Sequence, residues 1–212
     1  MNHEQTTTHK QQAEALAIQI AVKRLAEQGD LAVRCERLGL NIPAACGGKV
    51  RVAMFGKMLE MTPPDFDGVV LETGKPPKNA DRVLALHYLL CDVPVVPEER
   101  WITFRDFSGG AFYWQPFLSR SIQPLVGRIG NDLNLLRERV QQRFAARIES
   151  GPADALSARI QAVGNMDMLL VYRAGDDEFP ASADLLFDAG FRRAFCAEDA
   201  VVLGSGVCLG LL

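Results

Sequence analysis

The segment Ala158–Arg173, with the sequence ARIQAVGNMDMLLVYR, decides the fold. Two runs suited to β-strands flank Gly164-Asn165, a pair of residues that favours a tight turn. The segment is therefore predicted to form a β-hairpin. Its second strand, Met168–Tyr172, is apolar enough to lie in the middle of a sheet.

Two further segments predict hairpins. Lys49–Phe55 alternates apolar and polar residues, and Gly56-Lys57 turns it into Met58–Met61. Trp101–Phe107 is followed by a serine, two glycines and a second aromatic run, Ala111–Trp114. Hairpin strands pair in antiparallel fashion, whereas parallel strands need a crossover after every strand. The predicted fold class is therefore α+β, with an antiparallel sheet built from hairpins and flanked by helices.

Helices are predicted between and around these hairpins from the spacing of apolar residues and from capping residues. They cover Thr8–Gln28, Leu31–Leu38, Asn79–Cys91, Asn131–Glu149 and the segment from Pro180 onward. No linker divides the chain, so residues 1–212 are predicted to form a single domain, with residues 1–9 as a flexible tail.

The charge balance excludes one class of partner. The chain has 23 basic and 26 acidic residues and a formal net charge of −3. A general nucleic-acid binder needs a basic surface to neutralise phosphates, and no basic stripe is visible. The polar N-terminus is not a secretory signal, and Ala200–Leu212 is too short and too rich in glycine to span a bilayer. We therefore predict a cytoplasmic protein with no nucleic-acid or membrane partner, and a buried C-terminal segment.

The cysteines are scattered along the chain. Because the spacing of metal and cluster ligands requires close pairs such as Cys-x-x-Cys, the sequence predicts unbridged thiols, no metal site and no intrinsic iron–sulfur cluster. The five residues concerned are Cys35, Cys46, Cys91, Cys196 and Cys208. Phosphate-binding loops, dinucleotide fingerprints and nucleophile elbows are also missing from the sequence, so the cofactor is left unknown.

His87 is the one histidine outside the N-terminal tail. It lies on an apolar helical face, between Leu86 and Tyr88. Its functional interpretation is an acid–base group or an axial ligand to a bound cofactor. The favoured interpretation is a histidine at the edge of the core, hydrogen-bonded to a backbone carbonyl or a carboxylate.

An acidic turn, Asp176-Asp177-Glu178, follows the apolar strand of the deciding hairpin and precedes Pro180. Such a cluster could bind a divalent cation, or keep one carboxylate protonated for proton transfer. The favoured alternative is a solvated turn that caps a helix opened by Pro180, because acidic residues stabilise the positive end of a helix dipole. Asp177 and Glu178 are the candidate site residues of this turn.

The aromatic segment Phe104–Trp114 supplies two more candidates. Its rings could form a pocket wall for a planar ligand, with Trp114 as part of the wall and Arg105 as an anion contact. Aromatic residues of a hairpin are more often its inward face.

Several of these motifs together resemble an uncharacterised prokaryotic domain family whose members are often labelled as iron–sulfur cluster proteins. The resemblance covers the chain from about residue 15 to the end. It implies a soluble domain with no established reaction. The iron–sulfur label fits members with an additional cysteine-rich module, which this sequence lacks, so that property is not carried over. The matching segments are Leu86–Leu90, Trp101 with Phe104–Phe107 and Gly109-Gly110, Glu178–Ser182, Leu186–Asp188 and Glu198–Ala200.

Three hypotheses for function follow. The first is a ligand-binding or accessory protein that serves a redox or corrinoid-type system, with a small molecule or a protein as its partner. The second is an enzyme that uses the carboxylates of the Asp176–Glu178 turn, with or without Mg²⁺. The third is a structural subunit of a larger complex, with the apolar C-terminus as an interface.

Overall fold

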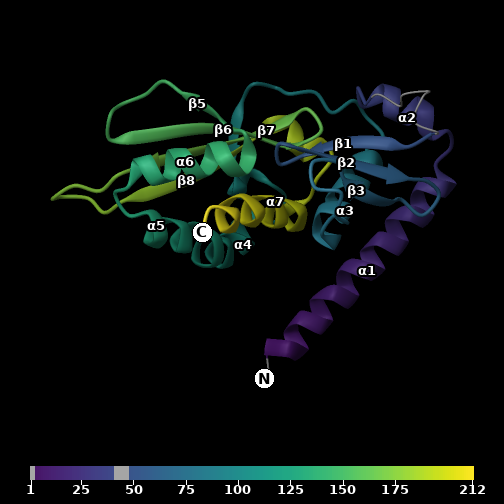
Figure 1. Ribbon diagram of the computed structural model, residues 1–212, viewed down its shortest axis with the longest axis horizontal. Coiled ribbons are helices and arrows are strands. Elements are labelled where there is room, and N and C mark those ends of the chain that lie inside the picture. The colour runs from purple at the N-terminus through teal and green to yellow at the C-terminus, as the bar shows by residue number, and fades with distance from the viewer. Residues whose placement is uncertain (1–2, 41–47) are drawn as a thin grey trace.

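A computed structural model describes residues 3–40 and 48–212 (Figure 1). Its centre is an eight-stranded sheet in which every paired strand is antiparallel. Helices pack around this sheet, so the predicted α+β class is confirmed. The strands follow the order β3-β2-β1-β6-β7-β8-β4, and β5 pairs with β6. Their bounds are β1 Val50–Met54, β2 Lys57–Thr62, β3 Asp67–Val70, β4 Trp101–Thr103, β5 Arg147–Glu149, β6 Ala155–Val163, β7 Met166–Arg173 and β8 Ser182–Asp188.

The β6–β7 hairpin occupies the middle of the sheet, as predicted. Its register runs from Ala155 opposite Arg173 to Val163 opposite Met166. Gly164 occupies the turn with a φ of +58°, in the left-handed region that glycine adopts without steric cost. A Cβ atom at this position would lie 2.4 Å from Cζ of Tyr88. Both the backbone conformation and the packing therefore require glycine here.

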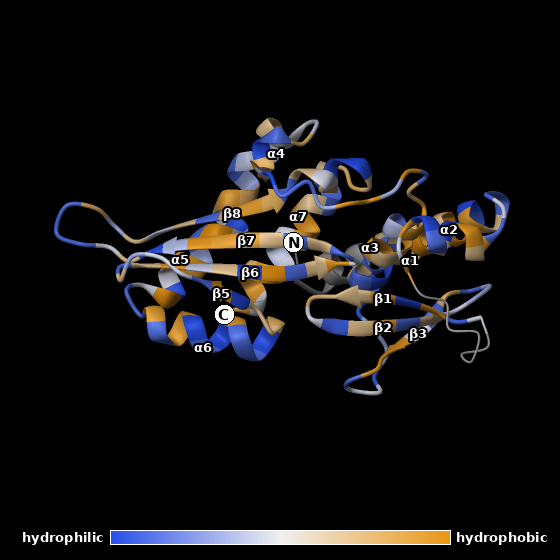
Figure 2. Cartoon of the chain, turned by 90° about the horizontal axis from the view of Figure 1, so that it is seen from above, coloured by the Kyte–Doolittle hydropathy of each residue, from blue (hydrophilic) through white to orange (hydrophobic). Residues whose placement is uncertain are grey.

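The sheet has two halves that meet over a very short join. One half contains β1, β2 and β3, and the other contains β4 to β8. Met54 opposite Val163 is the only residue pair between β1 and β6 in the described part of the chain. Phe55 N donates to Ala162 O at 3.0 Å, and Gly164 N donates to the carbonyl of residue 53 at 2.8 Å. The β1–β2 turn therefore meets the β6–β7 turn end to end, as Figure 2 shows.

Helices cover this join. The last helix, α7, packs against α3, α4 and α5, and Figure 1 shows it between α3 and α4. Its residues Ala200, Leu203 and Val207 are fully buried, which confirms the predicted burial of the C-terminal segment. Helix α1 packs along α3 and extends away from the body of the molecule. The bounds are α1 His3–Glu27, α2 Leu31–Arg37, α3 Asn79–Leu89, α4 Gly110–Phe117, α5 Gln123–Ile129, α6 Leu133–Phe144 and α7 Ala197–Gly210.

The predicted hairpin at Trp101–Trp114 is wrong. Only Trp101–Thr103 is a strand, and it pairs with β8. The next residues form a short 3-10 helix, Phe104–Asp106, which is closed by Asp106: its carboxylate accepts from the backbone N of Thr103 at 2.7 Å. Gly109 then begins α4 with a φ of +80°. Within α4 the ring centroids of Trp114 and Phe117, three residues apart, are 6.2 Å apart, and Phe104 of the 3-10 helix packs on Phe117 at 4.7 Å.

The prediction of helices from Pro180 onward is wrong in its first part. Ser182–Asp188 is strand β8, paired along its whole length with β7. Every second residue, Ala183, Leu185 and Phe187, places its side chain on the covered face of the sheet. This period of two is that of a strand and not of a helix. The end of the chain, from Ala197, is helical as expected.

Other predicted elements differ at their ends. Helix α6 stops at Phe144 instead of Glu149, because Ala145 is left-handed with a φ of +48°, and Arg147–Glu149 joins the sheet as β5. Helix α1 begins at His3 instead of Thr8. Strand β3 has no counterpart in the prediction. Among the described residues, no helix combines the length and apolar character needed to cross a membrane.

Candidate functional site

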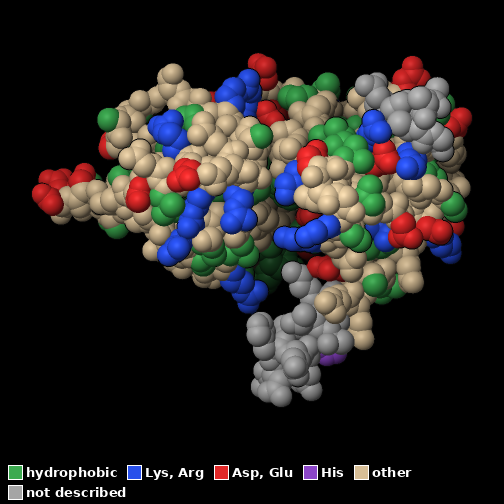
Figure 3. Space-filling model, viewed as in Figure 1, with side chains coloured by type: hydrophobic (Ala, Val, Ile, Leu, Met, Phe, Trp, Pro, Cys, Tyr) green, Lys and Arg blue, Asp and Glu red, His purple; other side chains and the backbone are tan. Residues whose placement is uncertain are grey.

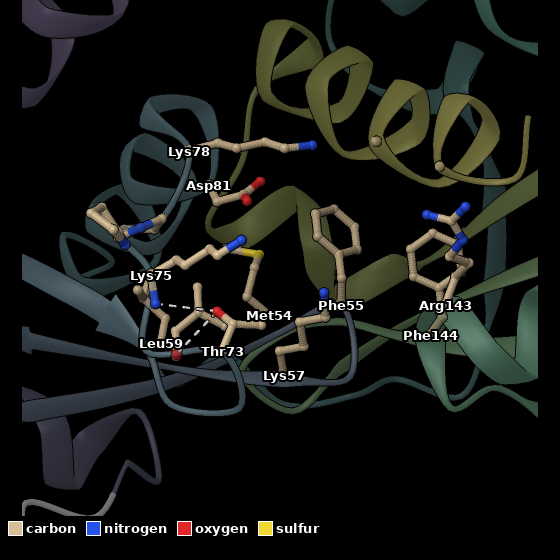
Figure 4. A pocket seen from close by; sticks show the side chains of 15 residues that line it. Met54, Phe55, Lys57, Leu59, Thr73, Lys75, Lys78, Asp81, Arg143 and Phe144 are labelled. Carbon is tan, nitrogen blue, oxygen red and sulfur yellow. Dashed lines mark hydrogen bonds between the residues drawn. The ribbon is translucent and has the colours of Figure 1, made fainter.

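A pocket of about 320 Å³ lies where the two halves of the sheet meet. Its walls come from the β1–β2 turn, the loop before α3, the first turn of α3, the last turn of α6 and the second half of α7 (Figure 4). The volume is at the small end of the range for ligand sites, which are concave and mostly apolar with a few placed polar groups. Its position depends on the short join, because a continuous sheet would fill this space.

Aromatic rings form one wall of the pocket. The ring centroids of Phe55 and Phe144 are 6.0 Å apart, with an interplanar angle of 59°. Helix α7 passes beside both rings and carries glycine at the two closest positions. A Cβ atom would lie 3.1 Å from Phe55 at Gly206, and 2.8 Å from Phe144 at Gly210. The glycines of α7 thus leave room for the two rings.

Phe55 has an unusual backbone conformation. Phe55 and Gly56 are the central residues of the β1–β2 turn, with φ angles of +52° and +73°. A turn with two positive φ angles favours Asn-Gly, and an L-residue other than Asn, Asp or Gly pays about 1–2 kcal/mol there. Figure 4 shows the Phe55 ring pointing into the pocket. Residues held in such conformations cluster at ligand sites, so we treat Phe55 as a candidate ligand contact.

Four basic side chains converge on the same pocket. Lys57 begins β2, Lys75 and Lys78 belong to the loop before α3, and Arg143 lies in the last turn of α6. In the described part of the chain, none of the four side chains makes a salt bridge or a hydrogen bond. Lys49 shows the contrast, because its Nζ pairs with Glu60 at 2.9 Å. In Figure 3, blue side chains lie on both sides of a hollow near the middle of the face.

Asp81 is the one acidic side chain among the described residues that line the pocket. It lies in the first turn of α3 and is half-buried. Burial raises the pKa of this carboxyl, and the nearby Lys78 and Lys57 oppose the rise. Four cations and one carboxylate leave the lining with a net charge of about +3.

The start of α3 adds to the positive potential. Its N-cap residue, Lys78, offers no side-chain acceptor to the free amide groups of the first turn. Unsatisfied amides and the helix dipole both favour an anion at such a position. The pocket therefore combines an apolar floor with several converging groups that attract negative charge.

His87 lies at the other end of α3, outside this pocket. Its Nδ1 is 2.8 Å from Oδ1 of Asp199 in the first turn of α7, and its side chain is 32% exposed. The predicted contact with a carboxylate is confirmed. Cys196 also donates to the Asp199 carboxylate, through its backbone N at 3.3 Å and its Sγ at 3.4 Å. The group borders a shallow surface depression of about 460 Å³.

Arg105 and Trp114 contact each other but do not line the pocket. The Arg105 guanidinium lies 4.5 Å from the centroid of the Trp114 ring. That ring packs in turn against Phe104, at a centroid distance of 6.5 Å. The segment is thus a helical aromatic cluster.

The acidic turn is the tip of the β7–β8 hairpin, which projects from one end of the molecule in Figures 1 and 3. The Asp176 carboxylate accepts from the backbone N of Phe179 at 2.7 Å and of Glu178 at 2.9 Å, and these bonds lower its pKa. Asp177 and Glu178 are exposed. The turn follows a central strand as predicted, but Pro180 leads into β8 and not into a helix. No ion pair joins Arg105 to this turn in the described structure.

The described cysteines are free thiols. Burial raises the pKa of Cys35 and Cys196 to about 11 and that of Cys208 to about 12, so these thiols are protonated at neutral pH. Cys46 lies outside the described residues. Within the described ranges, no group of three or more His, Cys, Asp or Glu side chains is placed to hold a metal ion.

The sequence analysis missed the pocket altogether. Its lining comes from five segments, and one of them, the loop before α3, belongs to none of the predicted helices or hairpins. One local signal was present, namely a phenylalanine before Gly56 at a tight turn where asparagine is the expected residue. Three lysines that each lie next to a turn glycine or a proline were a second signal.

Comparison with curated proteins and with solved structures gave no match. A family model, in contrast, matches most of the chain, from residue 30 to residue 209. The matched region begins just before α2 and ends in the last turn of α7, so it contains every described strand of the sheet and every residue that lines the pocket except Gly210. The resemblance to a domain family without an assigned function is thereby confirmed. The chain belongs to the family described as Domain of unknown function (DUF3786).

Proposed function

We propose that this protein binds a small anionic molecule with an apolar part in the pocket between the two halves of the sheet. The observation that carries the proposal is the convergence of four unpaired cations on a pocket with an aromatic wall. Like charges gathered in a concave site raise the local concentration of an oppositely charged ligand. The ligand then neutralises the positive charge that remains after Asp81, the one carboxylate in the described lining, is counted.

The lining supports binding more directly than catalysis. Its one hydroxyl among the described residues, on Thr73, is 3.4 Å from the carbonyl of Val70 and 3.3 Å from the backbone N of Lys75. No histidine or cysteine belongs to the described lining, and no side-chain base is hydrogen-bonded to the Thr73 hydroxyl or to a lining lysine among the described residues. His87, which was considered as an axial ligand to a bound cofactor, lies outside this pocket. The proposal is therefore a ligand-binding role without a redox partner.

Calorimetric titration of the full-length protein with pyrophosphate at low ionic strength tests the proposal. Saturable binding is expected, and the double variant Lys57→Gln/Lys75→Gln should bind at least tenfold more weakly, a factor that corresponds to about 1.4 kcal/mol. The affinity of the wild type should also fall as salt is added, because exposed charges are screened.

The matched control is Lys23→Gln/Arg137→Gln. It removes two exposed cations that do not line the pocket, and so changes the net charge by the same amount. Pyrophosphate binding should be retained in the control. Absence of saturable binding by the wild type, or an equal loss in both double variants, would reject the proposal.

A further inference from the structure

Asp81 differs from the other acidic residues that begin helices in this protein. Three residues after the N-cap of its helix, Asp106 accepts from the backbone N of Thr103 at 2.7 Å, and at the same position of α7 Asp199 accepts from the backbone N of Cys196 at 3.3 Å. These carboxylates serve as caps. The Asp81 carboxylate, in the comparable first turn of α3, has no hydrogen bond and no salt bridge among the described residues. Capping therefore does not account for its position.

The environment of Asp81 makes an unpaired carboxylate unfavourable. The side chain is half-buried in the pocket wall, where burial raises its pKa; Lys78 and Lys57 oppose the rise, but among the described residues neither makes a salt bridge or a hydrogen bond with it. Leaving a partly buried polar group without a partner costs free energy, and the cost is larger for a charged group. Figure 4 shows the carboxylate on the same wall as Lys78. A ligand group that donates a hydrogen bond would satisfy it.

The remaining charges indicate the anionic part of the ligand. With Asp81 ionised, the lining has a net charge of about +3. A monocarboxylate would leave most of this charge uncompensated. A phosphate monoester or a diphosphate carries two or three negative charges and offers several acceptor oxygens to lysine and arginine.

We propose that Asp81 determines ligand specificity by accepting a hydrogen bond from a sugar hydroxyl group of a phosphorylated, ring-bearing ligand such as a nucleoside diphosphate. The phosphates lie among Lys57, Lys75, Lys78 and Arg143, and the ring lies against Phe55 and Phe144. This inference rests on the proposed anion-binding function and adds the donor group to the ligand.

Matched probes isolate this contact. Adenosine diphosphate and its 2′,3′-dideoxy analogue share the ring and the phosphates and differ only in the ribose hydroxyls. In calorimetric titrations of the full-length protein, in buffer without divalent cations, adenosine diphosphate should bind at least tenfold more tightly than the dideoxy analogue. In Asp81→Asn this preference should fall to less than threefold, because a neutral amide accepts a weaker hydrogen bond than a carboxylate.

Pyrophosphate, which has no hydroxyl-bearing sugar, distinguishes a hydrogen bond to Asp81 from mere repulsion of anionic ligands by its carboxylate. A carboxylate that only repels anions would weaken all three probes, so its removal would tighten all three equally. The proposal instead requires that Asp81→Asn bind pyrophosphate as tightly as the wild type or more tightly, while the preference for the hydroxylated probe is lost. The variant Glu198→Gln removes an exposed carboxylate from the first turn of α7, outside the pocket, and should leave all three affinities unchanged.

The possible outcomes distinguish the two proposals. If the wild type binds pyrophosphate but shows no preference between the two nucleotides, or binds neither nucleotide, the role of Asp81 is rejected and anion binding stands. Equal tightening of all three probes in Asp81→Asn also rejects the role of Asp81. If pyrophosphate does not bind the wild type, anion binding itself fails. A thermal denaturation curve of each variant verifies that it is folded.

Discussion

Nδ1 of His87 lies 2.8 Å from Oδ1 of Asp199, so the last turn of α3 is tied to the first turn of α7. Both helices contribute to the pocket at their opposite ends, through Asp81 in α3 and through Gly206 and Gly210 in α7. The polarity of the contact suits both helix dipoles, because it places a basic group at a C-terminus and an acidic group at an N-terminus. The pair therefore fixes the relative position of two walls of the pocket.

Replacement of His87 tests this structural role. His87→Gln should lower the free energy of unfolding by about 1–3 kcal/mol, because glutamine replaces a buried hydrogen-bond partner imperfectly. The exposed His9 provides the control, and His9→Gln should change stability by less than about 0.5 kcal/mol. Urea denaturation measures both values. A variant that kept full stability but lost a bound ligand would show that His87 is functional instead.

The glycine at the β6–β7 turn should be sensitive to a single added carbon. Gly164→Ala has two costs: the new methyl group collides with the Tyr88 ring, and alanine is strained in the left-handed backbone conformation. The free energy of unfolding should therefore fall by more than about 2 kcal/mol. Gly39 has a similar φ of +68° but open space around it. Gly39→Ala should therefore lose about 1 kcal/mol, from the backbone alone. Equal shifts of the urea midpoint in the two variants would contradict the packing argument.

Phe55 should matter more for binding than for stability. Phe55→Asn removes a half-buried ring but relieves a backbone conformation that costs about 1–2 kcal/mol for phenylalanine, so the change in stability should stay below about 1 kcal/mol. Binding of phenyl phosphate should weaken to the level of inorganic phosphate. The control variant is Phe112→Asn, which removes an exposed aromatic ring from α4, outside the pocket, and should leave the binding of phenyl phosphate unchanged. If Phe55→Asn bound phenyl phosphate as the wild type does, the ring would have no part in the site.

The acidic turn should respond to pH through Asp176, whose carboxylate accepts two backbone hydrogen bonds. Its lowered pKa means that the ionised carboxylate contributes stability above the pKa of the unfolded chain. This contribution is lost as the pH falls through the lower pKa of the folded state. Asp176→Ala should therefore destabilise the protein at pH 7 and lose its effect in acid, while Asp177→Ala changes little at either pH. Thermal denaturation at pH 7 and in acid compares the two variants, and the opposite ranking would point to a role for Asp177 outside the turn.

The elements that the sequence predicted well are those with local determinants. The β6–β7 and β1–β2 hairpins each contain a turn glycine with a positive φ, and α3 and the final helix follow apolar spacing. The segment after Trp101 was misassigned because its glycines suggested a hairpin turn, whereas Gly109 begins a helix. Strand β8 was missed because Pro180 was taken as a helix start and the alternation of Ala183, Leu185 and Phe187 was not given weight.

The pocket could not be predicted in the same way. Lys57 and Arg143 are far apart in the sequence and line one pocket because the β1–β2 turn packs closely against the end of α6, where a Cβ atom at Gly56 would lie 2.5 Å from the Phe144 carbonyl oxygen. The lysines beside a glycine or a proline mark turns, but their sequence does not tell which turns lie next to each other in the fold. The strained Phe55 is the residue whose local sequence already departs from expectation, and it is also the residue that points into the pocket.

The short join between the halves of the sheet also has a mechanical consequence. A single residue pair and a few turn hydrogen bonds resist bending far less than a full ladder of strand pairs does. A molecule bound in the pocket would contact β2 and α3 on one side and α6 on the other. It would therefore connect the two halves of the sheet across their short join. A bound ligand should therefore reduce the motion of the two halves relative to each other. The amide hydrogens of Phe55 and Gly164, which form the hydrogen bonds of the join, should exchange with solvent more slowly when the ligand is bound.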